Sequence, residues 1–260
     1  MKKILPLLCI VLAMGACQNK PTETLWQNAQ WADSVLIDTA SNHCSAKVSL
    51  SIDYPTGGCE ALTDSINTWL CEQLGDSTHQ YLADIPGLLK HVGFSRLEHD
   101  EAEIRDCIST DADGGYALEY TYEREGKVIY EDSLYITLSL RCYQYTGGVH
   151  GSSDYFAATF RKAGGHRMDW DLLEGMNEKE IRQAIIRGLY KYFEVDNEAD
   201  LRDNLMLLVE DTADGSDPAL DEVLPLPQAA PFLTKEGVQV IYQQYEIACY
   251  AAGMPQCVVR

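Results

Sequence analysis

The chain has 260 residues, with 40 acidic and 20 basic side chains, so its formal net charge is −20 at pH 7. A surface this acidic repels nucleic-acid phosphates and anionic lipid headgroups, which argues against nucleic acid as a partner and favours cationic proteins. Solubility alone is an alternative reason for the charge. The hydrophobic content of 46% is ordinary for a globular core, so the charge does not indicate disorder.

The N-terminus has the pattern of a bacterial lipoprotein signal. Residues 1–3 are basic at Lys2 and Lys3, residues 4–13 are apolar, and small side chains stand directly before Cys17. This order predicts a signal peptide over residues 1–16 and a lipid on Cys17; an ordinary signal peptide that ends near a cysteine is the alternative. The apolar run is shorter than the roughly 20 residues that cross a bilayer, so the lipid is expected to be the anchor.

Gln18 and Asn19 follow Cys17, and no aspartate stands next to the cysteine. By resemblance to other lipoproteins of bacteria with two membranes, this favours the outer membrane. Periplasm and exterior both remain open as the compartment that the domain faces.

The rest of the chain is predicted to be a tether followed by one domain. Residues 17–30 are polar at their start and contain Pro21, which is typical of a segment that holds a domain away from a membrane. Residues 31–260 are expected to form the domain, with an N-terminal part over 31–110 and a C-terminal part over 111–260.

The N-terminal part is predicted to combine one strand with two helices. Apolar and polar residues alternate over 46–54, which indicates a half-buried strand that ends at Pro55. Apolar side chains at helical spacing predict a helix over 62–74, stopped by Gly75, and a weaker helix over 77–89.

The middle of the chain is predicted to be rich in strands. Alternating patterns cover residues 116–123, 128–130, 134–142 and 156–160, and short turns join them. Strands at this spacing favour an antiparallel meander.

Helices come next, and a hairpin lies near the C-terminus. Asn177 with Glu180 predicts a capping box at the start of one helix, and Asn197 is expected to begin another that reaches Leu208. Residues 212–231 are acidic and rich in proline, which predicts a loop, and residues 232–242 follow as a hairpin. Because strands and helices do not alternate regularly, the expected fold class is α+β, an antiparallel β-sheet meander flanked by helices.

Seven cysteines follow Cys17, an odd number that leaves at least one thiol unpaired. Cys249 and Cys257 flank a predicted turn and could form a disulfide. Cys71 and Cys142 lie in apolar patterns and are predicted to be buried thiols. No CxxC or HExxH spacing occurs, so neither a metal site nor a cofactor is predicted.

The sharpest local feature is the loop between the two strongest strands. The predicted binding residues here are Tyr145, Thr146, Gly147, Gly148, His150 and Gly151. Glycines permit backbone angles that other residues resist and allow a partner to approach closely. His150, Ser152 and Asp154 offer a hydrolytic trio, but neighbours in sequence seldom form a triad and no GxSxG motif is present. A structural loop, whose histidine bonds backbone, and a binding loop are the two remaining interpretations.

A tyrosine-rich stretch near the C-terminus is the second candidate. Its predicted binding residues are Tyr242, Tyr245, Glu246 and Tyr250. Tyrosines at this density offer an amphipathic surface for a glycan or a protein. The alternative is a strand and turn at the edge of the core, with tyrosine hydroxyls at its rim.

Residues 145–151, residues 171–173 and residues 245–253 occur in an order that resembles the PdaC/RsiV-like family of extracytoplasmic domains. The resemblance covers about residues 45–260 and is firmer in the C-terminal half. It implies a single α+β domain with an antiparallel sheet and flanking helices. Members include the lysozyme-sensing part of an anti-sigma factor and an accessory domain of a peptidoglycan deacetylase. The chain shows neither a sigma-binding segment nor a deacetylase domain, so those activities are not expected of it.

The sequence therefore predicts a non-enzymatic lipoprotein of the cell envelope. Its expected partners are the membrane, through the lipid on Cys17, and either a cationic lysozyme-like protein or peptidoglycan fragments. The alternative is a wall-acting hydrolase in which His150 is the general base and a carboxylate its partner. A carboxylate bonded to His150 at a pocket would favour the hydrolase, and an open acidic surface would favour binding.

Overall fold

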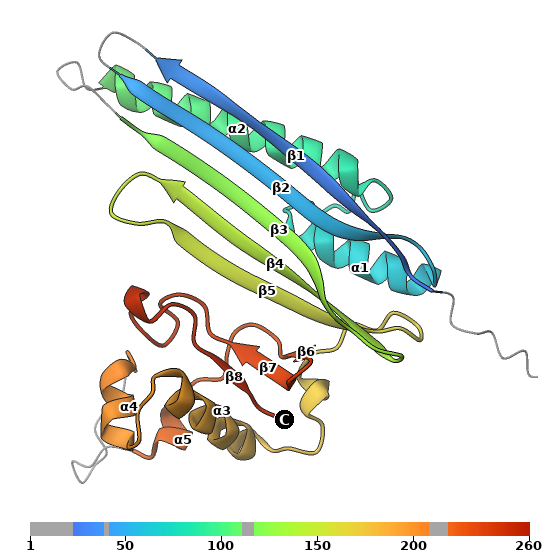
Figure 1. The fold of residues 1–260 in the computed structure, drawn as a ribbon, viewed down its shortest axis with the longest axis vertical. Coiled ribbons are helices and arrows are strands. Elements are labelled where there is room, and N and C mark those ends of the chain that lie inside the picture. Colours follow the sequence, from blue (N-terminus) through green and yellow to red (C-terminus); the bar gives the residue numbers. More distant parts are fainter. Residues whose placement is uncertain (1–22, 39–41, 111–116, 208–217) are drawn as a thin grey trace, which may run out of the picture.

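The computed structural model describes residues 23–38, 42–110, 117–207 and 218–260 (Figure 1). In these residues a five-stranded sheet carries two helices, and a smaller unit with a three-stranded sheet lies below its last strand in the view of Figure 1. The predicted α+β class is confirmed. Cys17 and the predicted signal peptide lie outside the described residues.

The elements of the larger unit are β1 (Leu25–Asp38), β2 (His43–Gly57), α1 (Glu60–Gln73), α2 (Ile85–Thr110), β3 (Glu119–Glu131), β4 (Tyr135–Thr146) and β5 (Ser152–Arg161). Those of the smaller unit are η1 (Trp170–Leu173), α3 (Glu178–Tyr192), α4 (Glu198–Asn204), α5 (Leu220–Val223), β6 (Phe232–Thr234), β7 (Gly237–Ile241), η2 (Tyr250–Ala252) and β8 (Gln256–Val258).

The large sheet has the order β1-β2-β3-β4-β5. β1 and β2 form an antiparallel hairpin, and β3, β4 and β5 form the expected antiparallel meander. β2 and β3 are parallel, with Ser45 opposite Glu119, so the sheet is not antiparallel throughout. The reason is that α1 and α2 stand between these two strands and return the chain to the end where β2 began, as a parallel pair requires.

Strand β1 begins inside the predicted tether, which corrects the assignment of residues 17–30 from Leu25 onward. Ala29 is buried, and Trp31 packs on α2, edge to face with Phe94 at a centroid distance of 5.2 Å. Gly93 of α2 makes this packing possible, because a Cβ there would lie 2.1 Å from Trp31 Cε3. Polar residues of β1 face solvent on the other side, so its apolar signal is sparse.

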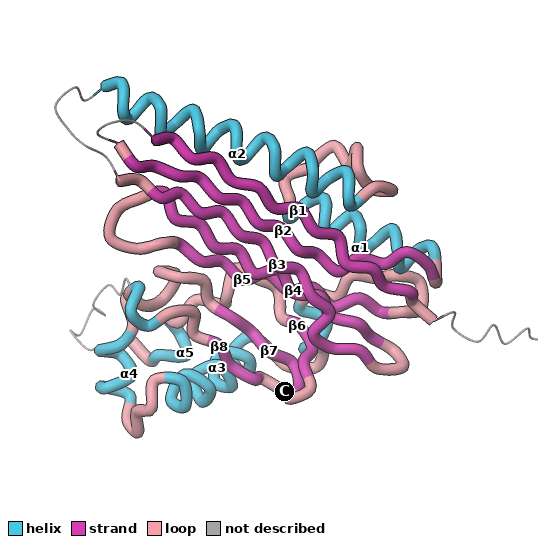
Figure 2. The backbone as a smooth tube through the Cα atoms, turned by 45° about the horizontal axis from the view of Figure 1, so that its top comes forward, coloured by secondary structure: helices cyan, strands magenta, loops and turns pink. Residues whose placement is uncertain are grey.

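Both helices of the larger unit cover one face of the sheet, with α2 along β1 and β2 (Figure 2). The weak helix predicted over 77–89 is instead α2, which starts at Ile85. Asp84 accepts the N–H of Gly87 at 2.9 Å, and Pro86 lies in the first turn, and both features favour a helix start here. After Gly93 its buried residues are only Asp100 and Ile104, so apolar periodicity could not reveal its length. No described helix has both the length and the apolar character needed to cross a membrane.

The smaller unit confirms most of the local predictions. Asn177 accepts the N–H of Glu180 and the Glu180 carboxylate accepts the N–H of Asn177, which is the predicted capping box of α3. Asn197 accepts the N–H of Asp200 and caps α4, but the helix ends at Asn204, which corrects the predicted extent to Leu208. The predicted hairpin is present as β6 and β7. The predicted loop over 212–231 contains the short helix α5, and its residues 212–217 are not described.

Buried hydroxyls join the two units. Thr137 of β4 and Thr159 of β5 share a hydrogen bond of 2.8 Å, and Leu233 of β6 donates its N–H to the Thr159 hydroxyl at 2.8 Å. The contact fixes the C-terminal segment against β4 and β5. This brings residues 242–252 to the loop that joins those strands.

Candidate functional site

The loop between β4 and β5 is shaped by two consecutive glycines. Gly147 and Gly148 have φ angles of 88° and 87°, in the region that glycine adopts without strain. The hydroxyl of Tyr145 donates to the Gly148 carbonyl at 3.0 Å and closes the turn. Val149 at its tip is fully exposed. The loop therefore projects into solvent with a defined shape.

Gly151 brings the loop back to the sheet. It is buried, and a Cβ at this position would lie 2.5 Å from Cε2 of Tyr143, so glycine lets the Tyr143 ring lie against the backbone and a larger residue would displace the ring. His150 stands between this close contact and the exposed tip, and its imidazole is held at the surface.

The second predicted stretch begins in the core. The side chain of Tyr242 is buried and donates a hydrogen bond to the Pro225 carbonyl at 2.7 Å. Burial raises the pKa of the Tyr242 hydroxyl well above its usual range. Tyr242 was predicted to bind a partner, and its burial corrects this prediction, because a side chain without exposed surface cannot contact one.

The residues after Tyr242 are anchored by side chains that replace missing backbone bonds. Gln243 accepts the N–H of Tyr155 at 2.9 Å and donates to the Tyr155 carbonyl at 2.9 Å, which continues the ladder of β5. Gln244 accepts the N–H of Ser153 at 2.8 Å. The Glu246 carboxylate accepts the N–H groups of Gln243 at 2.7 Å and Gln228 at 2.8 Å. Glu246 therefore supports the segment from within, and the anchoring role of the two glutamines had no signal in the sequence.

Tyr245 stands on this anchored turn in a strained conformation. Its φ angle is 65°, in the left-handed region that a tyrosine rarely adopts. Such strain persists only where neighbouring bonds hold it, and it is concentrated at functional sites. Its side chain is 52% exposed, so the turn presents an aromatic ring to solvent.

His150 and two tyrosines meet to form what we name the aromatic cluster, composed of His150, Tyr245 and Tyr250. The His150 ring stacks on Tyr250, with centroids 3.7 Å apart and planes at 18°. His150 Nδ1 lies 3.0 Å from the Gly151 carbonyl, which can only accept, so Nδ1 carries the proton in the neutral ring. Nε2 is then free to accept the Tyr245 hydroxyl, which lies 3.2 Å away.

The structure thus brings together residues from both predicted stretches, while other predicted residues have different positions. Gly147, Gly148 and Gly151 shape the loop, as described above. Thr146 is the last residue of β4, exposed and opposite Tyr120 in the sheet, and no interaction joins it to the aromatic cluster among the described contacts.

The hydrolytic trio does not assemble. Asp154 lies in β5 opposite Cys142, and Ser152 begins that strand. Both ring nitrogens of His150 are engaged by other groups, so within the described residues no carboxylate is hydrogen-bonded to it. The arrangement that the hydrolase alternative needs is not found there.

The two cysteines near the aromatic cluster in sequence, Cys249 and Cys257, do not form a disulfide. Cys249 is exposed, Cys257 is buried, and the two are not bonded, which corrects the possible disulfide. Burial raises the pKa of Cys257 to about 12. Gly188 of α3 would place a Cβ 2.5 Å from Cys257 Cβ, so Cys257 is buried by the close approach of β8 to α3.

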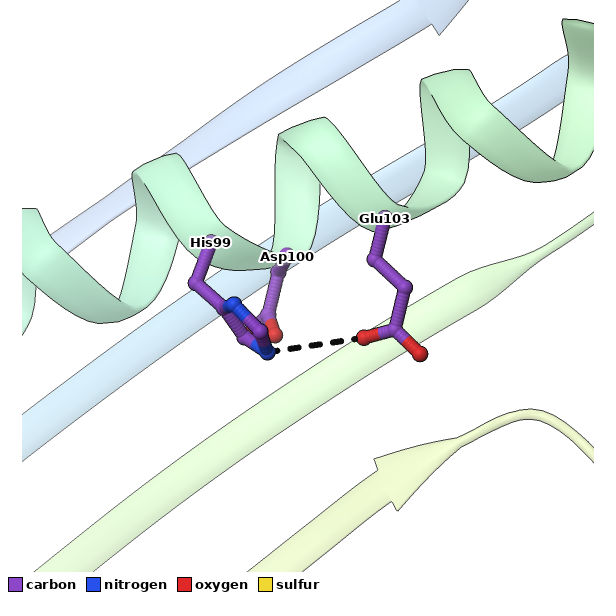
Figure 3. A group of neighbouring side chains, drawn as sticks. All are labelled: His99, Asp100 and Glu103. Atoms are coloured by element: carbon purple, nitrogen blue, oxygen red, sulfur yellow. Dashed lines mark ion pairs between the residues drawn. The ribbon is translucent and has the colours of Figure 1, made fainter.

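One group of ligand-type side chains occurs in the described residues, at His99, Asp100 and Glu103 of α2 (Figure 3). Their ligand atoms lie within 4.8 Å of one another. However, Arg96 Nε donates to the buried Asp100 carboxylate at 3.0 Å and its guanidinium lies over the Tyr122 ring. Burial raises the pKa of Asp100 in spite of Arg96. Because Arg96 already pairs with the central carboxylate, we interpret His99, Asp100 and Glu103 as part of an ion-pair network at the edge of the core and not as a metal site.

Comparisons with known proteins agree with the fold. Residues 171–260 match the family described as Protein of unknown function (DUF3298). The search of curated proteins found no match. A solved member of the DUF3298 family from Bacteroides fragilis is similar, with 18% identity over 92% of this chain and 91% of its own, and a TM-score of 0.67. A DUF3298 family protein from Pseudomonas aeruginosa PAO1 aligns with 14% identity over 90% of each chain and a TM-score of 0.49.

The matched residues contain Tyr245 and Tyr250, whereas His150 lies before them, in the loop between β4 and β5. The aromatic cluster therefore joins the matched segment to the rest of the domain. Over residues 171–260 the chain matches the DUF3298 family, and as a whole it shares the fold of a solved member of that family.

Proposed function

We propose that the protein is a lipid-anchored, non-enzymatic binding protein of the cell envelope, whose aromatic cluster contacts a cationic protein. The observation that carries the proposal is the convergence of His150, Tyr245 and Tyr250 on one exposed surface. The anchored and strained turn under Tyr245 supports it, because preorganised side chains lose little entropy on binding.

Charge favours a cationic protein as the partner. The net charge of −20 attracts basic proteins and repels anionic ones. Aromatic rings attract lysine and arginine side chains through their negative faces, and exposed tyrosines are enriched in protein interfaces. The resemblance to the PdaC/RsiV-like family makes a lysozyme-like protein the first candidate. Peptidoglycan fragments, which also stack on aromatic rings, are the second outcome to be tested.

The anchor is part of the proposal. The lipoprotein signal pattern before Cys17 supports attachment by lipid, and the polar residues after it favour the outer membrane. A Cys17→Ser variant is expected to leave the membrane fraction and appear in the soluble fraction. If the variant stays with the membrane as firmly as the natural protein, another segment is the anchor.

The binding test uses residues 19–260, which lack the lipid, in calorimetric titration with a C-type lysozyme at low and at physiological salt. Binding is expected to persist at physiological salt and to be lost in a His150→Ala/Tyr245→Ala variant. The matched control is Tyr81→Ala/His91→Ala, which removes another stacked pair, with centroids 5.5 Å apart, far from the cluster in the chain.

Heat at low salt alone, or equal affinity of the two double variants, would reduce the interaction to general charge attraction and reject the aromatic cluster. Absence of heat at both salts would reject a lysozyme-like partner, and the same variants would then be titrated with peptidoglycan fragments.

A further inference from the structure

An acidic hollow lies beside the aromatic cluster. It has a volume of about 560 Å³ and is lined by the end of α3, the end of α4 and residues on both sides of Tyr250. We name this space the acidic hollow and define it by Glu194, Asp203, Met206, Cys249 and Ala251, which border it. Among the described residues, the charged side chains that line it are Glu194 and Asp203, so this part of the chain offers two exposed carboxylates and no basic side chain.

The surroundings add to its negative potential. Residues 194–204 contain five carboxylates and a single arginine. That arginine, Arg202, already donates to Glu198 at 2.7 Å and to the Pro218 carbonyl at 2.6 Å. The hollow also borders the C-terminal end of α3, where the helix dipole favours cations. Lys191, in the last turn of α3, is exposed and does not line the hollow.

Two hydrogen bonds hold the hollow and the aromatic cluster in one rigid surface. The Tyr192 hydroxyl donates to the Ala252 carbonyl at 2.6 Å, and the Met206 N–H donates to the Ile247 carbonyl at 2.7 Å. The first bond fixes α3 to the turn after Tyr250. The second fixes the chain after α4 to the turn after Tyr245. A partner that contacts the cluster therefore meets the hollow at a fixed position.

Backbone strain is found on both parts of this surface. In the described residues the non-glycine residues with positive φ are His79, Glu194 and Tyr245. Glu194 follows the C-cap of α3 directly and has a φ angle of 55°. Glycine is common at this position of a helix because it adopts a positive φ without strain. A carboxylate is thus held at the rim in a conformation that costs free energy, as is common at binding sites.

The lining suits a long cationic side chain. Met206 is 54% exposed, so it offers an apolar contact for an aliphatic stem, and the two carboxylates offer partners for its charged head. We propose that the acidic hollow receives a lysine or arginine side chain of the cationic protein that the aromatic cluster contacts. The inference rests on the proposed function and names the chemical group that is recognised beside the cluster.

The test compares two variants that remove the same charge. Glu194→Gln/Asp203→Asn neutralises the hollow, and Asp33→Asn/Glu98→Gln neutralises two exposed carboxylates on β1 and α2. Both are titrated with the C-type lysozyme over a range of salt concentrations. The hollow variant is expected to bind about threefold to tenfold more weakly than the control and with a smaller salt dependence. Equal affinity of the two variants overturns the proposal.

A second measurement separates the hollow from the proposed function. If lysozyme does not bind at all, the proposed partner fails, and a trilysine peptide is added to the protein labelled with ¹⁵N. Shifts of the Met206 and Ala251 amides that disappear in the hollow variant would still support a lysine site. Shifts that are absent, or equal in the hollow variant and the control, would overturn it.

Discussion

The rings of His150 and Tyr250 lie stacked, with centroids 3.7 Å apart, although one follows β4 and the other begins η2. The stack depends on the side chains of Gln243 and Gln244, which hold the chain against β5, and on the Glu246 carboxylate, which bonds the turn from within. The proposed binding surface is therefore held in place by hydrogen bonds between residues far apart in sequence. Backbone strain and burial can be tested at individual residues.

Tyr245 provides the first prediction. Because its φ angle is 65°, glycine at this position is expected to be more stable than alanine by about 1 kcal/mol, the reverse of the order in a helix. Urea denaturation of Tyr245→Gly and Tyr245→Ala measures the difference. Both variants lose the ring, so both are expected to bind lysozyme equally weakly. Equal stabilities would show that the turn relaxes and that no strain is held there.

The cysteines provide the second prediction. Cys249 is exposed, whereas burial raises the pKa of Cys257 to about 12 and that of Cys142 to about 11. Iodoacetamide is therefore expected to label Cys249 in the folded protein and the other two only after unfolding, because the thiolate is the reactive form. Mass spectrometry of peptides gives the order. A Cys249 that reacts only after reduction would instead indicate a disulfide.

The third prediction concerns the ion pair of α2. Asp100 has no exposed side-chain surface, and Arg96 is its charged partner. Arg96→Met leaves a buried carboxylate unpaired and is expected to lower the free energy of unfolding by about 3 kcal/mol. The control on the same helix is Arg105→Met, which breaks the exposed pair with Glu101 and is expected to cost less than about 1 kcal/mol. Equal losses in urea denaturation would contradict the structural importance of the Arg96–Asp100 pair.

The fourth prediction is a pH dependence at the turn between β3 and β4. Two opposing effects act on the pKa of Asp132. Partial burial raises it, and the hydrogen bonds from the N–H groups of Tyr135 and Leu134 and from the Tyr130 hydroxyl lower it by more. The pKa of Asp132 therefore lies below its ordinary value. A carboxyl whose pKa is lowered in the folded state contributes its full stabilisation at pH values above its unfolded pKa. This stabilisation is lost as the pH falls through the folded pKa.

Asp132→Asn keeps the shape of the side chain but not its charge. The variant is expected to be less stable than the natural protein at pH 7 by at most about 1 kcal/mol, because hydrogen bonds to a charged acceptor are stronger but solvent screens this exposed carboxylate. The difference should shrink as the pH falls through the folded pKa of Asp132. Thermal unfolding at several pH values measures it, and a difference that does not change with pH would show that the charge plays no part.

Sequence patterns predicted correctly those elements that depend on residues close together in the chain. The capping box of Asn177 and Glu180 and the hairpin of β6 and β7 are each set by neighbours in sequence, and both are present. α2 was predicted too short because its second half buries only two side chains and otherwise shows polar residues on all sides. The parallel pairing of β2 with β3 could not be seen, because alternation defines a strand and not its partner.

The sequence alone accounts for the acidic charge, the lipoprotein signal pattern, the α+β class and the two stretches that contain the candidate residues. Folding decides which of those residues share a surface. Tyr242 points into the core while Tyr245 and Tyr250 meet His150, because Gln243, Gln244 and Glu246 bond to chain segments far away in sequence. Neither periodicity nor composition carries information on such distant partners. The aromatic cluster therefore follows only from the packing of the smaller unit on the large sheet, and the acidic hollow only from the packing of α3, α4 and η2 within the smaller unit.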